Sequence, residues 1–332
     1  MRKLPVLLLH NLDPGWPSRD QETALREADR LASELGGLGH PVETVVVRHA
    51  DLSACLNAFD PAAWVVLNWC EELPGIPHSD ALVAEKLEEM GFTYTGSTAD
   101  VLRLSWDKAS VKHLLMEHGL PTPAWRIFDR ADPDGWSCYP AIVKPAHEHC
   151  SLGVSTEAVV LNGKELCTRI AYILDAFKQP ALVEDFIDGR EFHVSLWGND
   201  PVQMLPPAEM DFSRFGNVRD RLCTYDAKFL PGSLHYEEIL LRLPAPLTEP
   251  ESDLLLTTLR AAFRAHRCRD FARMDVRLRD GVFYILDINP NADISSDASM
   301  ACAAEAAGYS FGAMGSRLVH LAAARHPVFG RG

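Results

Sequence analysis

The first hundred residues alternate between short apolar runs and amphipathic segments, and this rhythm limits the possible folds more than any other feature. The apolar runs predict strands at residues 4–9, 42–47, 64–68 and 92–97. Between them, apolar side chains at helical spacing predict helices at residues 18–35 and 79–90. This alternation is typical of a parallel sheet with helices on both faces. We therefore expect an α/β N-terminal region.

The remainder of the chain is expected to contain a larger share of strands. Helices are predicted at residues 105–118, 164–177 and 251–266 and after Asp297, and strands at residues 125–128, 140–144, 154–161 and 181–186. Ser105 is expected to cap the first of these helices. The type of element changes near residues 100 and 187, which predicts three domains: 1–100, 101–187 and 188–332. The predicted class is α/β, becoming α+β in the C-terminal part.

The composition excludes several classes of function. Asp and Glu number 46 against 32 Lys and Arg in 332 residues, which gives a formal net charge of −14. A nucleic-acid-binding surface needs a surplus of cations, so we expect no nucleic-acid partner, whereas a nucleotide substrate needs only a few placed cations. No apolar stretch approaches the ~20 residues of a membrane span. Eight cysteines without a CxxC pair or a zinc-site spacing predict reduced thiols and a cytoplasmic protein.

Residues 271–289 predict a hairpin around Arg279-Asp280-Gly281. A two-residue Asp-Gly turn would place Met274 opposite Asp287. A three-residue loop, with Gly281 in the left-handed conformation, would instead give one continuous apolar face. We therefore expect the three-residue loop, which places Asp287 directly across from Arg273.

The opposite face of this hairpin is expected to gather polar side chains. Arg273, Asp275, Asp287 and Asn289 would lie together there. Two carboxylates and an amide oxygen suit Mg²⁺, which is commonly bound by one or two carboxylates plus substrate phosphates. The alternative is a solvated polar face with an Arg–Asp cross-strand pair. The rigid polar ending Asn289-Pro290-Asn291 favours the metal site.

Two further segments carry chemistry only in combination. The predicted strand at residues 140–144 ends in Lys144 and is followed by a loop containing Ser151 and Gly153, which can fold over phosphates. The motif is not a Walker A loop, and the alternative is an ordinary connection with an exposed lysine. A later strand ends at Glu184, and Glu191 opens the next one. These carboxylates suit a nucleotide's amine and ribose hydroxyls, or simply belong to a strand–turn–strand unit.

The motifs occur in a fixed order along the chain: Thr93-Tyr94-Thr95-Gly96-Ser97, Asp107-Lys108, Val143-Lys144-Pro145, Ser151-Leu152-Gly153-Val154-Ser155, Val183-Glu184 with Gly189-Arg190-Glu191, Tyr225-Asp226-Ala227-Lys228, Arg273-Met274-Asp275 and Asp287-Ile288-Asn289. Taken together they resemble the ATP-grasp superfamily over about residues 90–310. More closely they are similar to its D-alanine–D-alanine ligase branch. The resemblance implies an ATP-grasp fold with a Rossmann-like N-terminal domain, and it suggests a homodimer.

The resemblance also implies roles for the site residues. ATP would be held by Lys108, Lys144, Ser151, Gly153, Glu184, Glu191 and Lys228, with Glu184 at the adenine and Glu191 at the ribose. Arg273, Lys228 and Ser151 would act on the transferring phosphoryl group. Asp275, Asp287 and Asn289 would hold two Mg²⁺ ions, or Mn²⁺.

The implied reaction joins a small carboxylate to an amino-acid-like amine. The carboxylate would attack the γ-phosphorus, and the amine would then attack the acyl phosphate, giving an amide, ADP and phosphate. Water must be excluded meanwhile, so residues 147–155 and 230–238 are expected to act as lids.

Several residues depart from the family pattern and bear on the substrates. Residues 68–75 lack the family's glycine-rich first-domain motif, and Asp287 stands where the family has Glu. Asp293 and Asp297 point to a cationic or amine-bearing acceptor, or they cap a helix near residues 296–297. Two alternatives stay open: a true D-alanine–D-alanine ligase, and an inactive nucleotide-binding regulatory protein. The retained lysines, Arg273 and metal residues speak against the inactive protein.

Overall fold

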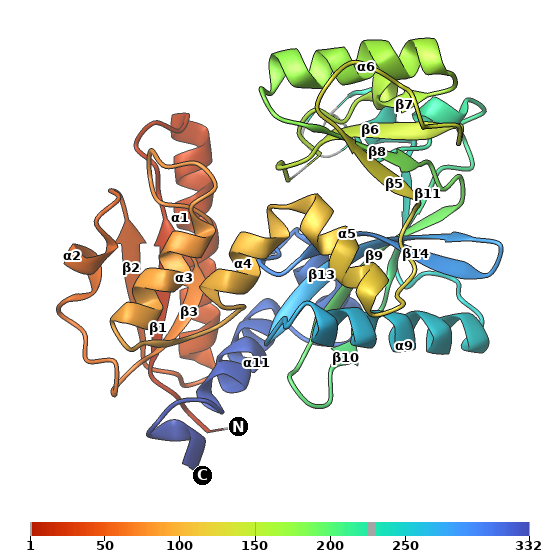
Figure 1. Cartoon of the computed structure of the whole chain (residues 1–332). Helices are drawn as coiled ribbons and strands as arrows, with labels where there is room; N and C mark the ends of the chain where they lie inside the picture. The colour runs from red at the N-terminus through yellow and green to blue at the C-terminus, as the bar shows by residue number, and fades with distance from the viewer. Residues whose placement is uncertain (1, 150, 225–226, 228–229, 231, 332) are drawn as a thin grey trace.

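The computed structural model describes residues 2–149, 151–224, 227, 230 and 232–331. It contains three sheets, arranged with the first beside the other two (Figure 1). The N-terminal sheet lies on one side of the molecule. The second and third sheets lie on the other side, one above the other in the view of Figure 1.

The first sheet is parallel and has the order β2-β1-β3-β4. Its strands and helices are β1 (Val6–Asn11), α1 (Ser18–Gly37), β2 (Val42–Val47), α2 (Leu52–Leu56), β3 (Val65–Trp69), α3 (Asp80–Glu89) and β4 (Thr93–Tyr94). Every residue of β1 is buried, as expected for a central strand covered on both faces. The prediction of a parallel sheet in an α/β region is confirmed.

Helices from both ends of the chain cover the first sheet. Apolar residues of α2 and α3 pack on one face, whereas α1 and the distant helix α11 (Phe311–Ala323) pack on the other. Helix α11 approaches α1 closely, because a Cβ on Gly312 would lie 2.6 Å from Cβ of Glu34 and one on Gly315 would lie 2.9 Å from Leu31. A short helix, α10 (Ser299–Ala306), precedes it.

The second sheet is antiparallel and has the order β5-β8-β6-β7. Its strands are β5 (Trp125–Phe128), β6 (Ala141–Pro145), β7 (Val159–Val160) and β8 (Ala181–Asp185). The helices α4 (Ala99–Ser105) and α5 (Lys108–Glu117) precede it in the chain, and α6 (Gly163–Ala176) connects β7 to β8. Apolar side chains of α6 cover its outer face. The predicted strand at 154–161 is wrong over most of its length, because a 3₁₀ turn at Thr156–Ala158 precedes β7.

The third sheet is antiparallel, with the order β12-β11-β9-β13-β14 and β10 on the side of β9. Its strands are β9 (Arg190–Trp197), β10 (Gln203–Met204), β11 (Ala208–Asp211), β12 (Leu240–Arg242), β13 (Phe271–Arg279) and β14 (Val282–Asn289). The helices α5 and α9 (Glu249–Ala265) cover one face of it with apolar side chains. A short helix, α8 (Leu234–Glu238), and 3₁₀ turns at Val218–Asp220 and Phe329–Arg331 complete the described elements.

The predicted three-residue loop between β13 and β14 is wrong. The hairpin closes through the two-residue turn Asp280-Gly281, whose φ angles of 52° and 76° suit a type I′ turn. The register then shifts at a β-bulge, because Val276 pairs with Ile285 whereas Asp275 pairs with Asp287, which leaves Leu286 as the extra residue. The bulge keeps the apolar face continuous on both sides. It also places Asp275, instead of Arg273, directly opposite Asp287.

Two helix boundaries also differ from the predictions. The segment expected as one helix at 105–118 is divided into α4 and α5, and Asp107 caps α5 by accepting hydrogen bonds from the backbone N–H groups of Ala109 and Ser110. Ser105 is the last residue of α4 and not a cap. Both bonds end on Oδ1 of Asp107, and its Oδ2 accepts from Oγ of Ser110 at 2.6 Å.

We propose that the boundaries near residues 100 and 187 separate three domains. In support, the three sheets comprise strands at 6–94, 125–185 and 190–289. The final helices depart from a strictly sequential arrangement, because α11 packs on the first sheet.

Candidate functional site

A pocket lies between the second and third sheets. Most residues of this first pocket come from β6, β8 and β9, from the loop after β6, and from the β13–β14 hairpin, and α5 contributes Lys108. It includes seven residues that the sequence singled out: Lys108, Lys144, Ser151, Glu184, Glu191, Asp275 and Asp287. Residues more than 170 positions apart in the sequence therefore meet in one cavity.

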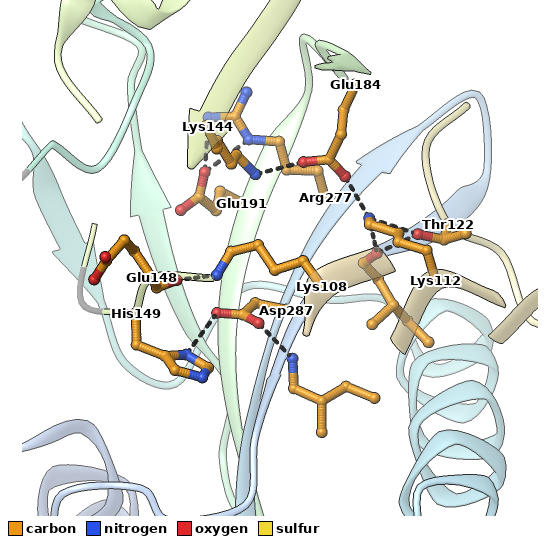
Figure 2. Close-up of polar contacts among 12 residues, drawn as sticks. Lys108, Lys112, Thr122, Lys144, Glu148, His149, Glu184, Glu191, Arg277 and Asp287 are labelled. Atoms are coloured by element: carbon orange, nitrogen blue, oxygen red, sulfur yellow. Dashed lines mark hydrogen bonds and ion pairs between the residues drawn. The ribbon is translucent and has the colours of Figure 1, made fainter. Parts of the chain in front are cut away.

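Glu184 is held between two lysines at one end of the pocket (Figure 2). Its Oε2 lies 2.7 Å from Nζ of Lys144, and its Oε1 forms an ion pair with Lys112. The Glu184 side chain is 1% exposed. Burial alone would raise the pKa of this carboxyl, but the charges of Lys112 and Lys144 outweigh it and bring the pKa to about 2. Glu184 is therefore ionised.

Lys112 is a site residue that sequence reasoning missed. It is buried on α5 and also donates a hydrogen bond of 2.7 Å to Oγ1 of Thr122. Lys112 follows Lys108 by four residues on one helix, a spacing that places both side chains on the same face. That spacing was a usable signal, since Lys108 was already a candidate.

Glu191 forms a second buried charge pair. Nε of Arg277 donates to its Oε2 at 2.7 Å, and Nε2 of His193 lies 3.3 Å from its Oε1. Burial opposes ionisation of Glu191, but Arg277 and His193 hold its pKa well below the usual range. Arg277 was also missed, although it follows Asp275 by two residues on β13 and so lies on the same face of the strand.

The predicted metal residues lie together on the polar face of the hairpin. Asp275 pairs directly with Asp287, and Arg273 pairs with Asn289. Arg273 binds Asp275 with two parallel contacts of 2.9 and 3.0 Å. Burial acts to raise the pKa of Asp287, but Lys108, His149, Lys144 and Arg273 lower it to about 2.

The oxygen atoms at this position suit a hard divalent cation. Asp275 and Asp287 supply four carboxylate oxygens on adjacent strands, and Asn289 adds an amide oxygen. Much of this set is engaged within the protein. Arg273 contacts both oxygens of Asp275, and Oδ1 of Asp287 and Oδ1 of Asn289 each accept a backbone N–H at 3.0 Å. The donor chemistry fits Mg²⁺, whose ligands are oxygens and retained waters.

A group of aromatic and charged side chains lies beside Asp287. Nδ1 of His149 is 3.9 Å from Oδ2 of Asp287, and Lys108 donates to the backbone oxygen of Glu148 (Figure 2). His149 packs edge-on against Trp106, with ring centroids 4.3 Å apart. Burial lowers the pKa of His149 to about 4, so the imidazole is neutral at pH 7. His149 is half-buried in the loop after β6 and lines the first pocket.

The loop after β6 crosses the pocket with backbone geometry that needs small residues. Ser151 and Gly153 have φ angles of 60° and 73°, and Oγ of Ser151 donates to the backbone oxygen of Cys223 at 3.2 Å. A Cβ at position 153 would lie 2.7 Å from Phe177 and 2.9 Å from Pro145. Gly153 is therefore needed for conformation and for close packing. The remaining predicted site residue, Lys228, lies outside the described residues.

Comparisons with known proteins agree with this architecture. A family model described as the D-ala D-ala ligase C-terminus matches residues 114–320. The D-alanine–D-alanine ligase of Desulforudis audaxviator is 30% identical over 331 residues, which cover 98% of this chain and 100% of that protein. A protein of Sinorhizobium fredii named uncharacterized protein y4sG is 33% identical over 316 residues, covering 92% and 90% of the two chains.

A solved structure shows the same fold. The crystal structure of D-alanine–D-alanine ligase from Bacillus anthracis complexed with ATP aligns with a TM-score of 0.72 and 17% identity, covering 96% of this chain and 97% of that one. The ATP-grasp fold with a parallel N-terminal sheet is thereby confirmed. Among the described residues, no helix is both long and apolar enough to cross a membrane. The chain belongs to the D-alanine–D-alanine ligase family of ATP-grasp enzymes, ligases that form carbon–nitrogen bonds.

Proposed function

We propose that the first pocket binds Mg-ATP and activates a substrate carboxylate for attack by an amine. The observation that carries this proposal is the pairing of Asp275 with Asp287 beside Arg273, in the same pocket that holds Glu184 between two lysines. A polyphosphate with its metal needs both signs of charge, placed in advance. The pocket offers both.

The nucleotide is assigned along the pocket as follows. Glu184 and Lys144 receive the adenine end, and Glu191, fixed by Arg277, receives the ribose hydroxyls. Lys108 and the loop containing Ser151 and Gly153 cover the phosphates. Lys228 is proposed for the γ-phosphate from the family resemblance alone. Asp275, Asp287 and Asn289 would hold Mg²⁺, which when bound neutralises phosphate charge and orients the phosphates.

The protein groups then serve two chemical steps. A carboxylate oxygen of the first substrate attacks the γ-phosphorus, the bond to the β-phosphate oxygen breaks, and ADP leaves. The Arg273 guanidinium stabilises negative charge on the transferring oxygens. An amine then attacks the acyl carbon, inorganic phosphate leaves, and the amine loses a proton as the amide forms. Neutral His149, 3.9 Å from Asp287, lines the same pocket.

D-alanine is the first substrate to test. The relative from Desulforudis audaxviator, aligned over 98% of this chain, carries the name D-alanine–D-alanine ligase, which supports this specificity. The replaced residues at 68–75 and 292–297 favour a different acid–amine pair. A homodimer stays a prediction, which light scattering of the purified chain will test.

The deciding experiment measures ADP release with Mg-ATP and a panel of amino acids and small carboxylates, taken singly and in pairs. We expect release that needs both an acid and an amine and yields one amide per ADP. D-alanine alone would suffice for a D-alanine–D-alanine ligase. If Mg-ATP fails to bind and no pair is turned over, the ligase proposal is wrong. Binding of Mg-ATP without turnover would favour the inactive regulatory protein.

A further inference from the structure

A second pocket lies at the N-terminal side of the molecule. It is lined by the ends of β1 and β3, by one side of α1, and by the loop that follows β14. The lining contains five carboxylate residues, namely Asp20, Glu27, Glu71, Asp293 and Asp297. The single arginine of the lining, Arg26, donates to Oγ1 of Thr23 at 3.3 Å.

The acidic residues of this second pocket have no cationic partners. Within the part of the chain that the structure describes, no ion pair joins any of the five to a lysine, arginine or histidine. Oδ1 of Asp293 accepts from the backbone N–H of Ser295 at 2.8 Å, and Oε2 of Glu27 accepts from that of Ser296 at 3.2 Å. Both carboxylates are thus bonded to backbone N–H groups and not to cationic side chains of the described residues. The expected role of residues 296–297 as a helix cap is wrong, because α10 begins after Ala298 and no side chain caps it.

Neighbouring carboxylates also act on one another here. Glu71 is accessible from the pocket, but the surrounding protein, with Asp293 and Glu72, raises the pKa of its carboxyl to about 8. The part of this rise that comes from Asp293 and Glu72 reflects a negative potential, which favours a cation. This effect comes in addition to the geometry of the pocket.

An independent observation comes from His10 at the end of β1. This residue lines the pocket and is 4% exposed, yet its Nε2 has no hydrogen-bond partner among the described residues. A buried polar nitrogen without a partner is costly, and a bound ligand can satisfy it. The imidazole is neutral at pH 7, because burial lowers the pKa of His10. It can therefore meet an ammonium or guanidinium without adding a positive charge.

Two tryptophans indicate what kind of cation fits. Trp16 and Trp69 line the same pocket and are half-buried. Indole faces attract organic cations and pack against aliphatic stems. A hydrated Mg²⁺ ion gains little from such walls, since its ligands are oxygens. The lining suits an amine or guanidine on a carbon chain.

The second pocket is also close to the proposed reaction centre. Asp293 follows Asn289 by four residues, so the Cα atoms of the two lie at most about 14 Å apart, at ~3.5 Å per residue. A substrate that binds at Asp293 can therefore extend to the end of the hairpin.

We propose that the second pocket selects an amine substrate that carries an additional cationic group, held by Asp293 and Asp297 and backed by His10. This inference rests on the proposed ligase function. The reacting amine must be neutral to attack the acyl carbon, whereas the additional group keeps its charge and anchors the molecule. The cation that the carboxylates lack within the protein is thus supplied by the substrate.

The test uses two pairs of amino acids that differ only in charge. Lysine is compared with 2-aminoheptanoate, in which a methyl group replaces the ammonium, and arginine is compared with citrulline, each as both enantiomers. Binding to the full chain with Mg-ADP is measured by calorimetry, and ADP release is measured with each as amine. We expect the cationic member to bind at least tenfold more tightly and to give the higher kcat/KM.

Charge-only variants separate this pocket from the first. The double variant Asp293→Asn with Asp297→Asn still has a side-chain oxygen at position 293 to accept from the N–H of Ser295, so the fold is expected to persist. The double variant should lose the preference for cations about tenfold while Mg-ATP binds normally. Asp297→Asn alone tests the same point at an exposed position, and Asp175→Asn on α6 serves as the matched control.

The outcomes distinguish the two proposals. Equal binding within each pair, or a preference unchanged in the double variant, would overturn the cationic-substrate inference while leaving ligase activity intact. A preference for cations that the double variant abolishes, without ADP release from any pair, would overturn the ligase function and leave the pocket as a cation site.

Discussion

The two pockets contain similar numbers of acidic residues but differ in whether these residues are paired with cationic side chains. In the first pocket Glu184, Glu191 and Asp275 each contact a lysine or arginine side chain. Glu184 and Asp287 consequently have pKa values near 2. In the second pocket the pKa of Glu71 is raised to about 8, because the surrounding protein buries the carboxyl and its neighbours are also acidic.

In the first pocket the acidic charges are balanced by the protein itself, whereas in the second a bound ligand would have to balance them. Paired charges are oriented before a ligand arrives, which is the condition for strong electrostatic stabilisation of a transition state. Unpaired carboxylates gain most from a cation that binds between them. The predictions below test this contrast, beginning with the largest expected effect.

Asp287→Asn should abolish turnover, with kcat reduced roughly a thousandfold or more, a loss of about 4 kcal/mol of transition-state stabilisation. The substitution removes the charge but keeps a side-chain oxygen on β14. Rates of ADP release across a range of Mg²⁺ concentrations measure the effect. Asp280→Asn in the hairpin turn is the matched control, because Asn tolerates the positive φ of that position. Normal turnover by the Asp287 variant would remove the proposed metal role.

Lys112→Met should lower the free energy of unfolding by about 3–5 kcal/mol, the usual cost of removing one partner from a buried ion pair. In this variant Lys144 would be the one remaining ion-pair partner of Glu184 among the described residues. The folded-state pKa of Glu184, about 2, lies below its usual 4.5, so the ionic stabilisation is present above pH 4.5 and is lost as the pH falls toward 2. The variant should show a weaker acid dependence in urea titrations. Lys164→Met, exposed on α6, should change stability by less than about 0.5 kcal/mol. Equal effects in both variants would contradict the paired-charge interpretation.

Gly153→Ala should cost about 1–3 kcal/mol, because the new Cβ meets Phe177 and Pro145 at a positive φ. If the loop covers the phosphates, KM for ATP should rise more than tenfold while the affinity of the second pocket for arginine stays unchanged. Gly36→Ala in α1 is the control, since nothing lies within 4 Å of its added Cβ. An unchanged KM would show that this loop does not contact the nucleotide.

The smallest expected effect is a pH dependence of the second pocket. The Glu71 carboxyl loses its proton as the pH rises through about 8, which adds a negative charge to the pocket. Arginine should therefore bind roughly threefold more tightly at pH 9 than at pH 7, consistent with about 1 kcal/mol or less for one accessible charge. Glu71→Gln should remove this rise, and Glu22→Gln on the outer side of α1 should retain it. Because ligand titration is common to all three proteins, their differences report on Glu71.

The sequence predicted most of the elements, and seven of its candidate residues line one pocket, but it did not predict how those residues pair. Repeating apolar positions placed the first three strands of the first sheet to within two residues, whereas the predicted fourth strand extends three residues beyond the end of β4. Periodicity failed at the β13–β14 hairpin, because an alternation read by eye assumes an uninterrupted ladder and Leu286 breaks it. The predicted polar face is present despite the wrong turn, because the bulge shifts β14 by one residue and still leaves Asp275 beside Asp287.

Residues that matter through distant partners were the hardest to find. Arg277 meets Glu191 across 86 positions, and Lys112 meets Glu184 across 72. Neither position is unusual in its own segment. His149 and Trp106 gave no signal at all, because their packing depends on how α4 meets the loop after β6. Of the second pocket, the sequence indicated only Asp293 and Asp297. Its other carboxylates lie far away in the sequence, on α1 and at the end of β3.

The packing of α11 on the first sheet has a consequence for how the chain is made. Val6, Leu8 and Leu67 share a core with Met314 and Leu318, so this core closes only after both ends of the sequence are available. Roughly 230 residues separate β4 from the end of α11, and a ribosome adds about 5–20 residues per second. For roughly 10–45 s of synthesis, one face of the nascent sheet is left without its last helix. That interval is when a chaperone has the greatest opportunity to bind this protein.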